Sequence, residues 1–243
     1  MTRLDEGATA TRIGVIVFDE DVTTEADLAR LRPAYEDVAI HVSRMPLPLD
    51  ASPAGLARTA DDIAAAATRL VPSTRLDAVG YSCTTGTLQL GYAAVAEAVE
   101  RGRPGVPVAT PITGAVKAFA ALGVRRVSLL TPYGPALNSL IVEHLARQNV
   151  RTLNIAAFDV PDEVDIARVS LSSLRTGAAS ALHAGADALF ISCTALRGTG
   201  LIDELETALG RPVVTSTQAL WWEALQLAGR PLRTERAGRL FAL

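Results

Sequence analysis

Cysteine and histidine are scarce in this chain, with two cysteines and three histidines among 243 residues. Cys83 and Cys193 form no C-x-x-C motif, so the sequence predicts neither a zinc site nor a disulfide framework. Long apolar runs are also missing, since none approaches the ~20 residues that a membrane-spanning helix needs. The start, MTRLDEGATATR, lacks the apolar core of a signal peptide. We therefore expect a cytoplasmic protein whose thiols stay reduced.

A surplus of one charge is absent as well. The formal net charge is −3, charged residues make up 20% and hydrophobic residues 49%, an ordinary globular composition. A basic face for nucleic acid is not indicated. Residues 101–107, RGRPGVP, match neither glycine-rich phosphate-binding motif, so nothing calls for a nucleotide or a metal. We expect no cofactor, no nucleic-acid partner and no membrane partner.

Short β-branched or apolar runs alternate with longer alanine-rich amphipathic segments. This pattern is typical of an α/β fold in which helices cover a parallel sheet. Strands are predicted at Ile13–Val17, Val38–Val42, Ala78–Tyr81, Val106–Ala109, Val127–Leu130, Arg151–Ile155, Ala188–Ile191 and Pro212–Val214.

The second half of the chain repeats the order of the first. R12IGVIV17 matches R126VSLLT131, D77AVGYSCT84 matches D187ALFISCT194, and G105VPVAT110 matches G210RPVVT215. This repeat predicts two pseudo-symmetric Rossmann-like lobes, each a parallel sheet flanked by helices. We place the first lobe at residues 1–117 and the second at 118–243, with the C-terminal helix crossing back.

Both cysteines follow a predicted strand that ends in serine. Ligands of such sheets bind beyond the carboxyl ends of the strands, so two facing lobes would bring Cys83 and Cys193 to one cleft. A thiolate and a thiol can serve as base and acid on opposite faces of a carbon acid. The turns T84TG86 and T194ALRG198 are each expected to lead into a helix, whose N-terminal amides favour an anion. The alternative is that both are small buried hydrophobic residues.

Three segments carry a resemblance to a known family: Y81SCTTGT87, T131PYGPALN138 and I191SCTAL196, in this order. They resemble the aspartate/glutamate racemase superfamily, in its maleate cis-trans isomerase and arylmalonate decarboxylase branch. Residues 107–116 and 211–222 are most similar to the ectoine-utilisation members of that branch. The likeness spans roughly residues 12–230 and implies a dimer or a tetramer.

The resemblance assigns roles to particular positions. It implies that Cys83 is the nucleophile or base and that Cys193 is the thiol that exchanges a proton on the other face. Tyr133 is similar to a tyrosine that binds a substrate carboxylate. The other positions implied to bind substrate are Asn138, Thr84, Thr85 and Thr194. Each of two positions also has a structural alternative to substrate binding. Tyr133 could be an aromatic residue that packs in a loop, and Asn138 could be a helix cap.

Two positions depart from the family pattern. Asp21 stands where dicarboxylate isomerases of this family carry an asparagine, and Glu163 aligns with a second asparagine. An acid would repel a second carboxylate and favour an ammonium or amide N–H. The substrate is thus expected to pair one carboxylate with a nitrogen group, as a diaminobutyrate derivative from ectoine breakdown does. Alternatively, Asp21 caps the following helix.

The expected function is a cofactor-independent isomerase or racemase of a small carboxylate that uses both cysteines. Two alternatives stay open. A decarboxylase would use Cys193 alone as its proton donor, although decarboxylases of this family resemble a version that lacks the first cysteine. A non-catalytic protein would bind a carboxylate in the same cleft.

Overall fold

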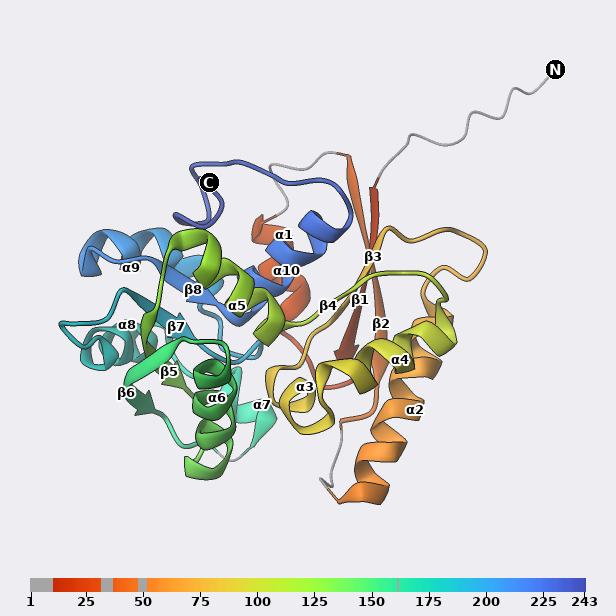
Figure 1. Ribbon diagram of the computed structural model, residues 1–243, viewed down its shortest axis with the longest axis horizontal. Coiled ribbons are helices and arrows are strands. Elements are labelled where there is room, and N and C mark those ends of the chain that lie inside the picture. The colour runs from red at the N-terminus through yellow and green to blue at the C-terminus, as the bar shows by residue number, and fades with distance from the viewer. Residues whose placement is uncertain (1–10, 32–36, 48–51, 161) are drawn as a thin grey trace.

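Two parallel sheets of four strands form the framework of the protein. The computed structural model describes residues 11–31, 37–47, 52–160 and 162–243, without the side chains of Pro53 and Glu163. The strand orders are β2-β1-β3-β4 and β6-β5-β7-β8, so the two halves share one topology. The predicted fold class, α/β with two lobes of parallel sheet flanked by helices, is confirmed (Figure 1).

Every predicted strand is present. The strands are β1 (Thr11–Phe18), β2 (Val38–Met45), β3 (Ala78–Tyr81), β4 (Val108–Ala109), β5 (Arg126–Thr131), β6 (Arg151–Ala157), β7 (Ala188–Ile191) and β8 (Val213–Thr215). The central strands β3 and β7 are buried along their whole length, as expected for parallel strands covered on both faces. β4 is shorter than predicted; Pro107, just before it, lacks an N–H and supplies only its carbonyl, to Val79.

Helices connect successive strands, as parallel pairing requires. In the first half these are α1 (Thr24–Leu31), α2 (Pro53–Arg69), α3 (Thr84–Leu90), α4 (Tyr92–Gly102) and α5 (Pro111–Leu122). In the second half they are α6 (Pro135–Arg147), α7 (Glu163–Ile166), α8 (Leu171–Ala181), the 3₁₀ helix η2 (Thr199–Leu201), α9 (Ile202–Leu209) and α10 (Ser216–Leu227). Within the described part of the chain, no helix is long and apolar enough to cross a membrane.

The repeat in the sequence reappears in the hydrogen bonds. Asp77 accepts the backbone N–H of Arg12 at 2.8 Å, and its counterpart Asp187 accepts that of Arg126 at 2.9 Å. Each aspartate precedes the third strand of its half and bonds to the beginning of the first strand. The two halves are therefore built in the same way where their central strands begin.

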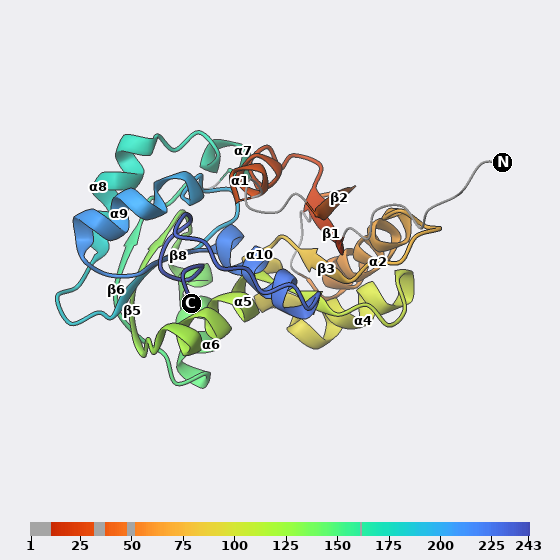
Figure 2. The same cartoon turned by 90° about the horizontal axis from the view of Figure 1, so that it is seen from above.

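Helices α5 and α10 lie between the two sheets (Figures 1 and 2). α10 follows the last strand but packs on the first lobe. A Cβ placed on Gly114 of α5 would lie 2.3 Å from the carbonyl oxygen of Ala219, and one on Gly80 of β3 would lie 3.1 Å from Leu220. One buried cluster accordingly contains side chains of both lobes, from Ile13 of β1 to Val213 of β8.

Candidate active site

The candidate site lies where the strand order of each sheet changes direction. β1 and β3 are neighbours, with β2 beyond one and β4 beyond the other, and β5 and β7 are related in the same way. Loops that leave the carboxyl ends of such a strand pair form a crevice where ligands bind. Asp21 and Cys83 follow β1 and β3, and Tyr133 and Cys193 follow β5 and β7. Topology thus accounts for the position of all four residues.

Cys83 is the cap of α3. Its backbone is extended and its Sγ accepts the N–H of Gly86 at 3.1 Å, while the Thr85 hydroxyl lies 3.7 Å from the same sulfur. The residue is 9% exposed. An N–H group that donates to the sulfur favours the charged form of the thiol over the neutral form, whereas burial opposes it.

Tyr81 lies on the same side of this segment as Cys83. Its hydroxyl is buried and makes no hydrogen bond to an oxygen or nitrogen of the described residues. Burial raises the pKa of Tyr81 well above its ordinary value, and the neighbouring Cys83 raises it further. The ring packs edge-to-face against Phe18.

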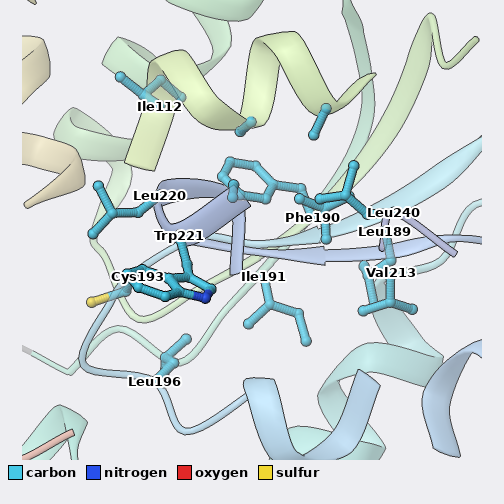
Figure 3. Packing of buried hydrophobic residues seen from close by; sticks show 14 of the residues in the cluster. Ile112, Leu189, Phe190, Ile191, Cys193, Leu196, Val213, Leu220, Trp221 and Leu240 are labelled. Atoms are coloured by element: carbon cyan, nitrogen blue, oxygen red, sulfur yellow. The ribbon is translucent and has the colours of Figure 1, made fainter. Parts of the chain in front are cut away.

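Cys193 has a different setting from Cys83. It is 3% exposed, its Sγ accepts the N–H of Ala195 at 3.4 Å, and its own N–H donates to the Ser216 hydroxyl at 3.1 Å. It packs in the cluster that holds Leu196 and Trp221 (Figure 3). The predicted course of the chain after this cysteine is confirmed, because residues 194–198 are non-helical, η2 begins at Thr199 and α9 begins at Ile202.

Hydroxyl groups connect the two cysteine motifs across the lobes. The Thr194 hydroxyl donates to the carbonyl of Ser82 at 3.1 Å, and the Thr84 hydroxyl lies 3.0 Å from that of Ser216. Ser216 also receives the N–H of Cys193. Hydrogen bonds therefore connect the segments around the two cysteines across the lobes.

Asp21 makes the contacts of a cap at the start of α1. Its Oδ1 accepts the N–H groups of Thr23 and Thr24, both at 2.8 Å, and its Oδ2 accepts the Thr24 hydroxyl at 2.6 Å. The Thr24 hydroxyl lies 2.9 Å from that of Ser82, and the Thr23 hydroxyl donates to the carbonyl of Thr194 at 2.9 Å. A single threonine therefore stands between the Asp21 carboxylate and each cysteine motif: Thr24 for the first motif and Thr23 for the second.

Tyr133 and Asn138 lie together after β5. Tyr133 is 7% exposed, and its carbonyl accepts an N–H of the Asn138 amide at 2.7 Å. The amide oxygen accepts the Thr131 hydroxyl at 2.7 Å. Asn138, in the first turn of α6, therefore holds the turn that carries Tyr133.

The remaining predicted residues divide into three groups. Thr84 and Thr194 use their hydroxyls to connect the lobes, whereas Thr85 directs its hydroxyl at the Cys83 sulfur. Glu163 begins α7, and its side chain lies outside the described residues. The predictions did not include Tyr81, Thr23, Thr24, Ser82 and Ser216. Tyr81 could have been found, because alternate residues of an extended segment share a side; Ser216 could not, since its partners lie far away in sequence.

The fold and the paired thiols define a class of two-lobed α/β proteins with cysteine at both lobes. The family model described as arylmalonate decarboxylase matches residues 35–241, and the chain belongs to this family. It is an enzyme of that family, and the resemblance to the maleate isomerase and arylmalonate decarboxylase branch is confirmed.

Individual relatives carry two activities. The chain is 33% identical to arylmalonate decarboxylase from Bordetella bronchiseptica over 144 residues, which cover 58% of this chain and 60% of the relative. It is 28% identical to maleate isomerase from Nocardia farcinica over 94% of both proteins.

Solved structures agree with this likeness. Maleate isomerase Iso from Pseudomonas putida S16, in a cysteine-to-alanine form with maleate, has a TM-score of 0.85 at 23% identity, over 96% of this chain and 98% of that one. The Nocardia farcinica enzyme, in a cysteine-to-serine form with a covalently bound succinylcysteine intermediate, has a TM-score of 0.82 at 24% identity, over 96% and 98%. At these identities the likeness establishes the fold.

Proposed function

We propose that the protein is a cofactor-independent isomerase or racemase of a small carboxylate, with Cys83 as nucleophile or base and Cys193 as acid. The observation that carries the proposal is the pair of thiols at the two switch points, connected through Thr194 to Ser82 and through Ser216 to Thr84. One thiolate and one thiol on opposite sides of a ligand supply both proton-transfer partners.

For a cis-alkene dicarboxylate the steps balance within the two thiols. The Cys83 thiolate forms a C–S bond to one alkene carbon, and the π electrons move to the adjacent carbon beside its carboxylate. The Cys193 thiol delivers its proton there, and rotation about the new single bond follows. Cys193 then removes a proton, the C–S bond breaks and the trans alkene leaves. The succinylcysteine in the Nocardia farcinica relative is the kind of adduct that this route forms.

For an amino-acid derivative the same pair would racemise the α-carbon. Cys83 would remove the proton from one face, and Cys193 would deliver one to the other. The Asp21 carboxylate, close to both cysteine motifs, favours a substrate that carries a nitrogen group beside its single carboxylate, and an acetylated diaminobutyrate from ectoine breakdown fits. Tyr133, Thr85 and the amides after each cysteine are proposed to bind the carboxylate, with Asn138 positioning Tyr133.

The test is proton NMR in D₂O with maleate, aspartate, arylmalonate and acetylated diaminobutyrates. Deuterium incorporation or isomerisation should fall by about 10²–10⁴-fold in both Cys83→Ala and Cys193→Ala, the range for losing an acid or base. Thr207→Ala, on the exposed face of α9, is the control with unchanged turnover. Full activity in either cysteine variant would exclude two-thiol chemistry.

A decarboxylase is the second candidate, and the family model and the 33% identical relative favour it. Loss of carbon dioxide would leave an enediolate that the Cys193 thiol protonates. Release of carbon dioxide that survives in Cys83→Ala and is lost in Cys193→Ala would establish this reaction.

The Asp21 charge has its own test. Asp21→Asn keeps an oxygen that can accept the N–H groups of Thr23 and Thr24 but removes the charge. If the charge selects the substrate, the ratio of kcat/KM values should shift toward maleate. An unchanged ratio would leave Asp21 with its capping role alone.

A further inference from the structure

The two cysteine motifs differ at the position two residues before the sulfur. The first lobe has Tyr81 there, and the second lobe has Ile191 at the end of the matching strand. Both residues are buried, at 1% and 0% exposure. Since a phenol can donate a hydrogen bond and an isoleucine cannot, the lobes offer their thiols different surroundings.

Tyr81 and Cys83 converge on one point. A Cβ built on Gly86 would lie 2.6 Å from the Tyr81 hydroxyl and 2.9 Å from the Cys83 sulfur, so only glycine leaves room for both groups. The buried hydroxyl has no oxygen or nitrogen partner among the described residues. A buried phenol without a partner is costly, and the sulfur is the acceptor beside it.

We infer that Tyr81 is a positioning residue that donates its hydroxyl proton in a hydrogen bond to the Cys83 sulfur and thereby makes Cys83, rather than Cys193, the resting thiolate. With the Gly86 N–H and the Thr85 hydroxyl it gives this sulfur three donors. A hydrogen bond to the charged form of a group favours that form. The raised pKa of Tyr81, to which the adjacent Cys83 contributes, keeps the phenol protonated as the donor.

Cys193, Tyr133 and Asp21 are titratable groups that also follow the carboxyl ends of the central strands, as do Asp19 and Glu20 after β1. The Asp21 oxygens are occupied by Thr23 and Thr24. Asp21 acts on the Cys83 segment through the pair of hydroxyls of Thr24 and Ser82. The inference deepens the proposed function, because it names the thiol that is ionised before substrate binds.

The experiment titrates each thiol alone by its thiolate ultraviolet absorbance. Cys83 is observed in Cys193→Ala, after subtraction of the variant without cysteines, and Cys193 is observed in Cys83→Ala. Tyr81→Phe should raise the pKa of Cys83 by about one unit, which lowers the thiolate fraction about tenfold at a pH below that pKa. The pKa of Cys193 should not change. Tyr92→Phe, which removes a phenol that donates to the Val108 carbonyl, is the matched control without effect.

A second variant keeps the phenol but displaces it. Gly86→Ala fills the point where the hydroxyl and the sulfur meet, and it should raise the pKa of Cys83 in the same direction. An unchanged pKa of Cys83 in both variants, or an equal rise with Tyr92→Phe, would overturn the inference.

Turnover provides an independent readout. In Tyr81→Phe we expect a lower kcat at neutral pH with KM unchanged, and an acid limb of the kcat/KM profile that moves up with the thiol pKa. The titration needs no substrate. If Tyr81→Phe shifts the pKa of Cys83 but the protein is inactive on every compound tested, the role of Tyr81 is upheld and the proposed function is not. If both thiols are needed for turnover but the pKa of Cys83 does not shift, the proposed function is upheld and the role of Tyr81 is not.

Discussion

Asp21 illustrates how one side chain serves several neighbours. Its carboxylate accepts two backbone N–H groups and the Thr24 hydroxyl, and the two threonines in turn contact Ser82 and Thr194. Both contacted residues stand next to a cysteine in sequence. The Asp21 carboxylate is therefore part of a hydrogen-bond network that reaches both cysteine motifs.

Stability should separate the two roles of Asp21. Asp21→Ala removes every acceptor, so the free energy of unfolding should fall by about 0.5–2 kcal/mol, the range for losing a helix cap. Asp21→Asn retains an acceptor and should lose less. Urea unfolding of the two variants measures the difference, and equal losses would mean that the charge itself carries the stabilisation.

At the scale of elements, the contact between α5 and α10 determines how closely the lobes approach. Gly114 faces the Ala219 carbonyl of α10, and the buried Glu223 of α10 accepts the Thr110 N–H and the Thr113 hydroxyl at the start of α5. α10 begins with Ser216, the hydroxyl that receives the N–H of Cys193. A shift of α10 would thus reach the active site directly.

Gly114→Ala should destabilise the protein even though alanine favours a helix by about 1 kcal/mol over glycine. The new methyl group would overlap backbone atoms of Ala219, which cannot move without α10, and overpacking typically costs about 1–3 kcal/mol. Gly200→Ala is the control, because its Cβ meets nothing nearer than the Arg30 side chain at 3.5 Å. Thermal unfolding compares them, and a melting temperature of Gly114→Ala at or above that of the control would contradict the prediction.

At the scale of the whole molecule, charge is buried where the lobes meet. Asp27 of α1 is 1% exposed, and burial raises its pKa despite hydrogen bonds from Thr199 in the second lobe and from Arg30. The folded state then holds a proton more tightly than the unfolded state. This contribution to stability is complete below the ordinary pKa of 3.8 and is lost as the pH rises through the folded value.

Asp27→Asn, which mimics the protonated form, should therefore unfold at higher urea concentration than the wild type at neutral pH, with a gain that disappears below the ordinary pKa. Asp187→Asn is the control with the opposite pH dependence. The hydrogen bond from Arg126 lowers the pKa of Asp187, so this carboxylate stabilises the fold above its ordinary pKa and the stabilisation is lost on acidification. Urea midpoints between acidic and neutral pH check both. A loss of stability in Asp27→Asn at neutral pH would contradict the prediction.

Much of the fold could be predicted because its signals are local. The central strands β3 and β7 were predicted with their observed ends, since short apolar runs bounded by polar residues specify buried parallel strands. The helix predicted after the turn T194ALRG198 is also confirmed, since η2 begins at Thr199 and α9 at Ile202. The sequence did not indicate that the Thr194 hydroxyl in this turn bonds to Ser82, which lies 112 positions away. A local sequence pattern cannot indicate a hydrogen-bond partner that lies so far away along the chain.

The two-lobed α/β architecture and the position of each cysteine after a central strand could be read from the sequence, because strand periodicity is a local pattern and the second half repeats the order of the first. The sequence also indicated that the C-terminal helix crosses back, but the contacts that join the lobes appear only in the folded structure: Ser216 connects Cys193 to Thr84, and Tyr81 meets Cys83 over Gly86. Contacts such as these between segments distant in sequence form when the lobes pack. Burial then decides which polar groups must find partners there.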